Sequence, residues 1–144
     1  MKIYRVTECY AELLEALERL LPQLSASATM PSKEYIENIL SNKSSHILVA
    51  EIDDKIVGML SLVIVDIPTG RKAWIEDVVV DDAARGLRLG QALVEQAKEL
   101  AASLGAKKIY LTSNPSRKAA HALYSKCGFV QYDTTLFRLL LQEK

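Results

Sequence analysis

The sequence predicts a mixed α/β (α+β) fold in which a mostly antiparallel central sheet is flanked by helices. Two observations carry this prediction. Residues 46–52, 55–65 and 72–80 are β-branched runs that follow one another across tight turns, and apolar residues recur at helical spacing before and after them. The chain has 144 residues, of which 49% are hydrophobic, so we expect a single domain over residues 1–144.

The opening of the chain reads as a strand, two helices and a loop between them. Residues 2–6 alternate as a short strand, and Thr7 is expected to cap a helix that stops near Pro22. Residues 22–31 are small and polar, which indicates a loop, and Ser32 can cap a second helix. The apolar positions that define the two helices are Leu13, Leu14, Leu17 and Leu21, then Tyr35, Ile36, Ile39 and Leu40.

The middle of the chain reads as a three-stranded meander. Asp53 and Asp54 separate the first two β-branched runs, a spacing typical of a hairpin with a tight turn. Residues 68–70, Pro-Thr-Gly, form a second turn that leads into the third run, 72–80. We therefore expect three antiparallel strands between residues 46 and 80.

The remainder alternates helices and strands. A helix is expected to begin between Gly86 and Gly90 and to end at Gly105, followed by a strand over 107–112. A further helix is expected over 115–126, ending before Gly128, and two short strands around Asp133 close the chain. The predicted order is βααβββαβαββ, with about seven strands and about four helices, and the strand–helix–strand step from 72 to 112 requires a right-handed parallel crossover.

Composition excludes several classes of protein. Eighteen basic and eighteen acidic residues give a formal net charge of zero, which argues against a broad nucleic-acid-binding surface. Cys9 and Cys127 have no CxxC partner, so a disulfide scaffold or a cysteine zinc site is not expected, and a reducing cytoplasm fits best. His46 and His121 form no metal-binding motif, and no signal-peptide or membrane-spanning run is present, so we expect neither metal nor membrane attachment.

The junction VVVDDAARGLRLGQAL, in which a strand passes through a short loop into a helix, is the most informative stretch for function. The first amides of such a helix point outward with the positive end of the dipole, and here Arg85 and Arg88 flank them. Each charge-assisted hydrogen bond to a phosphate contributes roughly 1.5 to 3 kcal/mol, against about 0.3 to 1 for the dipole, so a diphosphate is the natural guest. Many helices also begin after an Arg-Gly pair without any ligand. GxGxxG and the P-loop pattern are absent.

This junction resembles motif A of the GNAT superfamily of acyl-CoA-dependent N-acetyltransferases, Arg or Gln, two residues, Gly, any residue, Gly or Ala. Here it reads Arg85-Gly86-Leu87-Arg88-Leu89-Gly90, with Arg88 at the position of the usual glycine, where it either crowds the backbone or adds a phosphate ligand. Residues 113–129 resemble motif B of the same family, with its Asn, helix, Tyr and terminal Gly-Phe. The resemblance covers residues 46–132 well and the opening strand and helices more loosely.

The resemblance implies acetyl-CoA as co-substrate and no metal. In this family the sheet splays between its fourth and fifth strands, the pantetheine pairs with the fourth strand, and the diphosphate lies on the motif A amides. The cofactor-binding residues so implied are Val78, Val79, Val80, Arg85, Gly86, Leu87, Arg88, Leu89, Gly90, Gln91, Asn114 and Arg117. Asn114 is equally explained as a helix entry before a proline, and Arg117 either reaches the phosphates or solvates its helix.

Two residues are candidates for catalysis by resemblance. Only about 4 in 10,000 molecules of an amine with a pKa near 10.4 are neutral at pH 7, so a base is useful, and Glu76 occupies a position where relatives carry a carboxylate. Strand alternation puts 76, 78 and 80 on one face and Asp77 on the other, unless a bulge intervenes. A structural carboxylate paired with Lys or Arg is the alternative. Tyr124 matches the family's general acid for the leaving thiolate; without the resemblance it would read as a core residue.

The expected function is thus transfer of an acetyl group from acetyl-CoA to a primary amine in a ternary complex. The acceptor loops, about 22–31 and 66–71, do not choose among small-molecule, peptide and protein amines. A non-catalytic acyl-CoA-binding sensor module is the alternative, and a nucleotide-binding regulatory domain is a third. Relatives in this family often form homodimers through the sheet edge or C-terminal strands. Cys127 is expected to be buried, which argues against a mechanism that passes through an acyl-cysteine.

Overall fold

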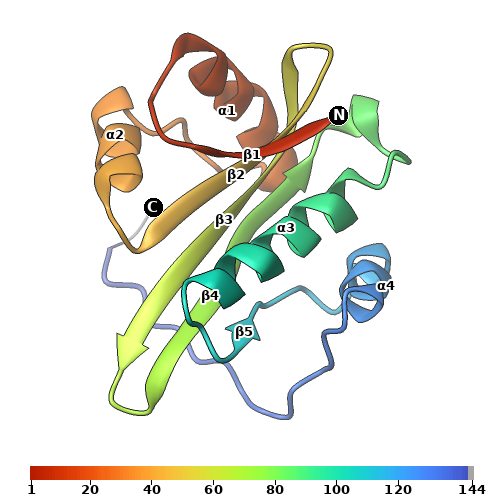
Figure 1. The fold of residues 1–144 in the computed structure, drawn as a ribbon. Helices are drawn as coiled ribbons and strands as arrows, with labels where there is room; N and C mark the ends of the chain where they lie inside the picture. The colour runs from red at the N-terminus through yellow and green to blue at the C-terminus, as the bar shows by residue number, and fades with distance from the viewer. Residues whose placement is uncertain (143–144) are drawn as a thin grey trace.

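The computed structural model describes residues 1–142, whose sheet separates two layers of helices (Figure 1). The helices α1 and α2 lie on one face of the sheet, and α3 lies on the other. The strands are β1 (Lys2–Val6), β2 (Ser45–Ile52), β3 (Lys55–Ile67), β4 (Gly70–Val80) and β5 (Ile109–Tyr110). The helices are α1 (Ala11–Leu24), α2 (Lys33–Ser41), α3 (Leu89–Ser103) and α4 (Lys118–Lys126), with a 3-10 turn η1 (Asp82–Ala84) before α3.

The sheet has the order β1-β2-β3-β4-β5 and is antiparallel except for the last pair. The predicted parallel step is present, because β5 runs parallel to β4 after the crossover through α3. That pairing involves only two residues of β4, Ala73 and Trp74, opposite Ile109 and Tyr110. Beyond Trp74 the strand β4 and the segment that follows β5 diverge, and the candidate active site lies where they separate.

Local sequence signals account for several of the helix ends and turns. Asp53 and Asp54 have φ values of 50° and 62°, so both take the left-handed conformation that a two-residue hairpin between β2 and β3 requires. The Ser32 hydroxyl accepts a hydrogen bond from the Tyr35 amide and caps α2 as predicted. Gly105 and Gly128, with φ of 84° and 93°, follow the ends of α3 and α4 at the left-handed position that favours glycine.

Two predictions about the first helix are wrong. Tyr10, not Thr7, precedes α1, and it offers no side-chain cap. The helix also continues through Pro22 to Leu24. Tertiary contacts hold this last turn: Gln23 donates to the Arg19 carbonyl and accepts a hydrogen bond from the Asp82 amide at 2.8 Å. These bonds offset the backbone hydrogen bond that a proline cannot make.

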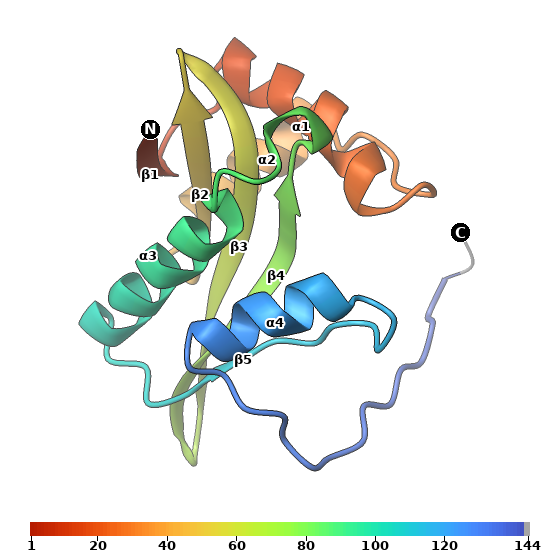
Figure 2. The same ribbon diagram turned by 90° about the vertical axis from the view of Figure 1, so that its right-hand side faces the viewer.

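The prediction of about seven strands is also wrong, since residues 1–142 contain five. The predicted strand 107–112 is reduced to Ile109–Tyr110, and the two strands expected around Asp133 do not form. Residues 129–140 instead run as an open trace below and beside the sheet (Figure 2). A strand requires a neighbour that completes its hydrogen bonds, and no neighbouring strand flanks this segment in the part of the chain described.

The core consists of two clusters, one on each face of the sheet. One joins the α3 face to even-numbered residues of β2 such as Leu48 and Ala50, and the other joins α1 and α2 to Ile47 and Val49. His46 is buried beside the first cluster, and neither ring nitrogen has a hydrogen-bond partner within residues 1–142. Burial, and secondarily the charge of Arg5, lowers the pKa of His46 below its ordinary value.

Candidate active site

A slot lies along the edge of β4, at the point where the segment after β5 turns away from this strand. The slot has a volume of about 100 Å³, and residues from four parts of the chain line it. They are Leu24 of α1, Ile75, Glu76, Asp77 and Val78 of β4, Leu111 and Thr112 after β5, and Arg117 and Tyr124 at α4. The fold therefore brings together Glu76, Val78, Arg117 and Tyr124, four of the residues singled out in the sequence.

A bulge in β4 sets the direction of these side chains. Ser61 of β3 lies opposite Glu76, but Met59 lies opposite Val79, so β4 has one residue more than β3 over this interval. Asp77 takes φ of 52° at this point. The extra residue reverses the alternation: Val79 joins the α1/α2 cluster, whereas Val78 and Val80 pack on the α3 cluster. The predicted shared face of residues 76, 78 and 80 is therefore wrong.

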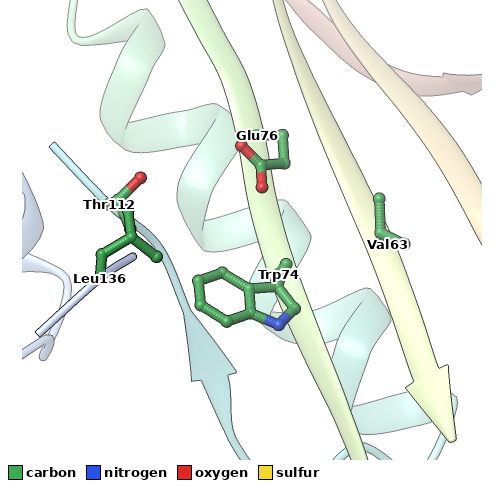
Figure 3. A pocket seen from close by; sticks show the side chains of 5 residues that line it. All are labelled: Val63, Trp74, Glu76, Thr112 and Leu136. Carbon is green, nitrogen blue, oxygen red and sulfur yellow. The ribbon is translucent and has the colours of Figure 1, made fainter. Parts of the chain in front are cut away.

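Glu76 lies where the slot meets a second hollow, of about 360 Å³, on the α1/α2 side of the sheet. Figure 3 shows Trp74 and Glu76 projecting from β4 between Val63 on β3 and Thr112 and Leu136 on the opposite side. Partial burial, and secondarily the neighbouring Asp77, raises the pKa of the Glu76 carboxyl above its ordinary value. None of the four ion pairs found among residues 1–142 includes Glu76, which leaves its carboxylate without the basic partner that a structural role would give it.

Tyr124 is half-buried on α4, and its ring packs edge-on against Phe129 with centroids 6.1 Å apart. Burial raises the pKa of its hydroxyl, while the nearby charge of Arg117 acts in the opposite direction. The hydroxyl is therefore protonated at neutral pH. Cys127, close by on the same helix end, is buried, and burial raises the pKa of its thiol, which disfavours a thiolate nucleophile.

The loop from Arg85 to Arg88 leads into the first turn of α3, beside α4. Gly86 has φ of 87°, and Arg88, the residue before the helix, has φ of 59° and makes no side-chain cap. The first helical amides therefore lack a cap from this residue. A Cβ on Gly90 would lie 2.8 Å from Leu123 Cδ1, so the first turn of α3 packs directly on the residue that precedes Tyr124.

Other predicted ligands engage neighbours in their own loops. The Arg85 guanidinium pairs with Asp82 at 3.0 Å, with both side chains mostly exposed. The side-chain oxygen of Asn114 accepts hydrogen bonds from the amide and hydroxyl of Ser116, at 2.9 and 2.8 Å, and so shapes the entry to α4. In the expected acceptor turn, Arg71 binds Asp66 through two hydrogen bonds of 2.6 and 2.9 Å.

Sequence reasoning missed a polar cluster that ties α1 to the start of this loop. Asp81 is buried and accepts hydrogen bonds from the Ala83 amide at 3.1 Å, from Arg19 Nε at 3.0 Å and from Gln23 Nε2 at 3.4 Å. These bonds, the backbone one first, lower the pKa of the Asp81 carboxyl. No local pattern joins residues 19 and 81, so only the packing of α1 on the sheet reveals the cluster.

No group of three or more His, Cys, Asp or Glu side chains that could hold a metal occurs among the residues described. Nor does any helix in residues 1–142 combine the length and apolar character needed to cross a membrane.

Comparison with known proteins identifies the family. The model of the Acetyltransferase (GNAT) family matches residues 10–129. The chain is 33% identical to Glucosamine 6-phosphate N-acetyltransferase 1 of Oryza sativa subsp. japonica over 84% of this chain and 77% of that protein. It is 30% identical to Streptothricin acetyltransferase of Escherichia coli over 95% and 85% of the two chains. A shorter match, 44% identical, covers 43% of this chain and only 36% of Probable glucosamine 6-phosphate N-acetyltransferase 2 of the same rice.

Solved structures agree with these relatives. Glucosamine-6-phosphate N-acetyltransferase from Arabidopsis thaliana has a TM-score of 0.80 at 28% identity, covering 96% of this chain and 97% of that one. A putative acetyltransferase from Agrobacterium tumefaciens str. C58 has a TM-score of 0.84 at 27% identity, covering 97% and 100%. On the family match over residues 10–129 and these relatives, the chain belongs to the GNAT family of acetyltransferases.

Proposed function

We propose that this chain transfers an acetyl group from acetyl-CoA to the primary amine of a small molecule. The observation that carries the proposal is the convergence of Glu76 and Tyr124, from β4 and α4, on one slot at the unpaired edge of β4. Acetyl-CoA lies along that edge, with its pantetheine against the backbone of Val78 to Val80. Its diphosphate lies on the amides from Arg85 to Gln91, with Asn114 and Arg117 beside it.

In the reaction, the amine nitrogen attacks the thioester carbon, the carbon–sulfur bond breaks and coenzyme A leaves. Glu76 takes a proton from the incoming ammonium, directly or through water, and its raised pKa makes it a better base than an ordinary carboxylate. Tyr124 gives its proton to the departing thiolate, for which its protonated state at neutral pH is required. The nitrogen loses its second proton as the amide forms, and that proton returns to the Tyr124 oxygen, directly or through water. Holding both substrates together contributes several kcal/mol, up to about 7 to 11.

The hollow between Trp74 and Leu136 is the proposed entrance for the acceptor. An aromatic wall and an adjoining carboxylate suit a compact cation that also carries an apolar or ring face. Relatives are named for glucosamine 6-phosphate and streptothricin, and a structure at 20% identity for an aminoglycoside. These names support a small amine-bearing molecule, of which an amino sugar is the first class to test.

The test is thiol release from acetyl-CoA with a panel of amines, measured beside calorimetric titration of acetyl-CoA. Tyr124→Phe should lower turnover by about 10 to 1,000-fold and leave the affinity for acetyl-CoA within about twofold. Tyr35→Phe, on the exposed side of α2, is the matched control and should behave as the wild type. Binding of acetyl-CoA without thiol release for any amine would instead make the chain an acyl-CoA-binding module.

A further inference from the structure

Lys72 and Glu76 stand at opposite ends of one row of side chains on β4. Residues 72, 74 and 76 precede the bulge, so strand alternation turns all three toward the same face of the sheet. Ala73 and Ile75 between them pack on the α3 cluster, on the other face. Trp74 and Glu76 line the acceptor hollow (Figure 3). Lys72 is therefore next to the hollow, beyond Trp74, at the end of the row that lies farthest from Glu76.

Two aromatic rings fix the position of the Lys72 ammonium group. Its Nζ atom lies 5.9 Å from the ring centroid of Trp74 and 5.4 Å from that of Tyr110 on β5. The two rings are themselves in contact, with centroids 5.2 Å apart. A cation at such distances from aromatic faces is held by their electron density. The positive charge is thus kept beside the hollow instead of extending freely into water.

The charges at the two ends of this row have opposite signs and lack ionic partners. None of the four ion pairs found among residues 1–142 includes Lys72, Lys108 or Glu76. Lys108 is exposed and lies beside the Lys72 end, because its carbonyl accepts a hydrogen bond of 2.9 Å from the Ala73 amide. A bound molecule with the reverse polarity would neutralise both ends, with an ammonium against Glu76 and an anion against Lys72.

The spacing of the row limits the length of such a molecule. Residues on the same face of a strand repeat about every 6.7 Å, and Lys72 Nζ lies within 6 Å of the Trp74 ring centroid. With a hydrogen bond of about 2.8 Å at each end, the amine and the anion of the bound molecule are on the order of 7 Å apart. This is the span of one sugar ring with its exocyclic group, or of a short ω-amino acid. A ring of that size can lie against the indole face of Trp74.

We propose that Lys72 determines acceptor specificity by selecting amines that carry an anionic group, a phosphate or a carboxylate, about one sugar ring away from the amino group. The inference rests on the proposed function, because Glu76 receives the amine end, and it adds a second requirement to that function. A phosphate gains most, since it carries about −1.5 to −2 charges at pH 7 and meets both Lys72 and Lys108. Lys72 is distant from the reacting atoms, so its contact is the same in the ground state and the transition state and acts on KM.

The test compares kcat/KM, measured by thiol release from acetyl-CoA, for two matched pairs of amines. Glucosamine 6-phosphate is compared with glucosamine, and 5-aminovalerate is compared with cadaverine, which carries an ammonium in place of the carboxylate. The wild type should favour the anionic member of a pair by at least about tenfold, mainly through a lower KM. A preference confined to the first pair identifies the anion as a phosphate, and one confined to the second identifies it as a carboxylate.

Three variants assign this preference to the charge of Lys72. Lys72→Met keeps an unbranched apolar side chain without the charge, and it should reduce the preference to within about threefold. The same variant should leave kcat/KM for neutral glucosamine within about twofold of the wild type. Lys72→Arg, which restores a cation over the two rings, should retain the preference. The matched control is Lys55→Met, at an exposed lysine at the far end of β3, and it should behave as the wild type.

Equal rates within both pairs, or a preference for glucosamine and cadaverine, would overturn the proposal. A preference that survives in Lys72→Met would assign the selection to another group. An equal loss for all four amines would mean that Lys72 only supports Trp74. If no amine releases thiol, the proposed function fails, and calorimetric titration of glucosamine 6-phosphate into protein saturated with CoA still decides the role of Lys72. Weaker binding in Lys72→Met than in the wild type would support that role, whereas equal binding or none in the wild type would refute it.

Discussion

Arg88 has the left-handed backbone conformation that favours glycine. Replacing Arg88 with glycine and with alanine separates the free-energy cost of this backbone conformation from the contribution of the arginine side chain. The left-handed conformation costs an L-residue roughly 1 to 2 kcal/mol, and glycine loses roughly 0.5 to 1 kcal/mol more backbone entropy than alanine on folding. The difference predicts that Arg88→Gly is more stable than Arg88→Ala by about 0.5 to 1 kcal/mol, or about 2 to 3 °C in Tm. Urea unfolding and thermal scans of the two variants measure this difference.

The same pair of variants tests the role of the guanidinium. Both lack it, so if Arg88 binds a phosphate, both should lose about 10-fold or more in affinity for acetyl-CoA, by calorimetry, relative to the wild type. Dephospho-CoA in place of CoA would show which phosphate is involved. An Arg88→Gly protein less stable than Arg88→Ala would refute the left-handed backbone, and equal affinity in all three proteins would remove the Arg88 side chain from the site.

Three further outcomes follow from the buried and half-buried titratable groups. Asp81→Ala should lower the free energy of unfolding, measured in urea, by about 2 to 4 kcal/mol, because Arg19 loses its buried partner. The control Asp82→Ala, at an exposed carboxylate, should change it by less than about 0.5 kcal/mol. Equal effects of the two variants would contradict the buried cluster. The lowered pKa of His46 means that the unfolded chain binds a proton at this residue more readily than the folded chain does. The free energy of unfolding should therefore be highest above pH 6.5 and should fall as the pH drops below that value. In unfolding curves taken across this pH range, His46→Gln should flatten the slope. The raised pKa of Glu76 means that this base becomes protonated as the pH falls through a value above the ordinary 4.5. The pH profile of kcat/KM should therefore show an acid limb there, and Glu76→Gln should remove that limb. An acid limb that persists in the variant would show that another group causes it.

The sequence was most informative where a single residue type decides the local structure. The Asp53-Asp54 turn, the Ser32 cap and the glycines after α3 and α4 all lie where they were expected, because left-handed φ values and helix amides make demands that few residues meet. Pro22 shows the limit of such signals. A proline ends a helix only if nothing else holds the next turn, and here Gln23, bonded to Arg19 and to Asp82, holds it.

The candidate site shows the same division. The residue types and spacing of Glu76, Arg85 to Gln91 and Tyr124 were readable, because each belongs to a short stretch with a recognisable pattern. The direction of Glu76 relative to Val78 and Val80 was not, since the bulge at Asp77 depends on the register of β4 against β3. Nor were Trp74, Thr112 and Leu136, which come from three separate segments and meet only in the hollow.

By itself, then, the sequence determined the hairpins, the helix faces and the family, all of which are encoded over short stretches of the chain. Tertiary structure alone decided where β4 parts from β5, which residues share the resulting slot, and that residues 129–140 form no strand within the part of the chain described. The physical reason is that a strand needs hydrogen bonds from another segment. An apolar alternating pattern in the sequence indicates that a segment can form a strand, but it does not show which other segment would pair with it.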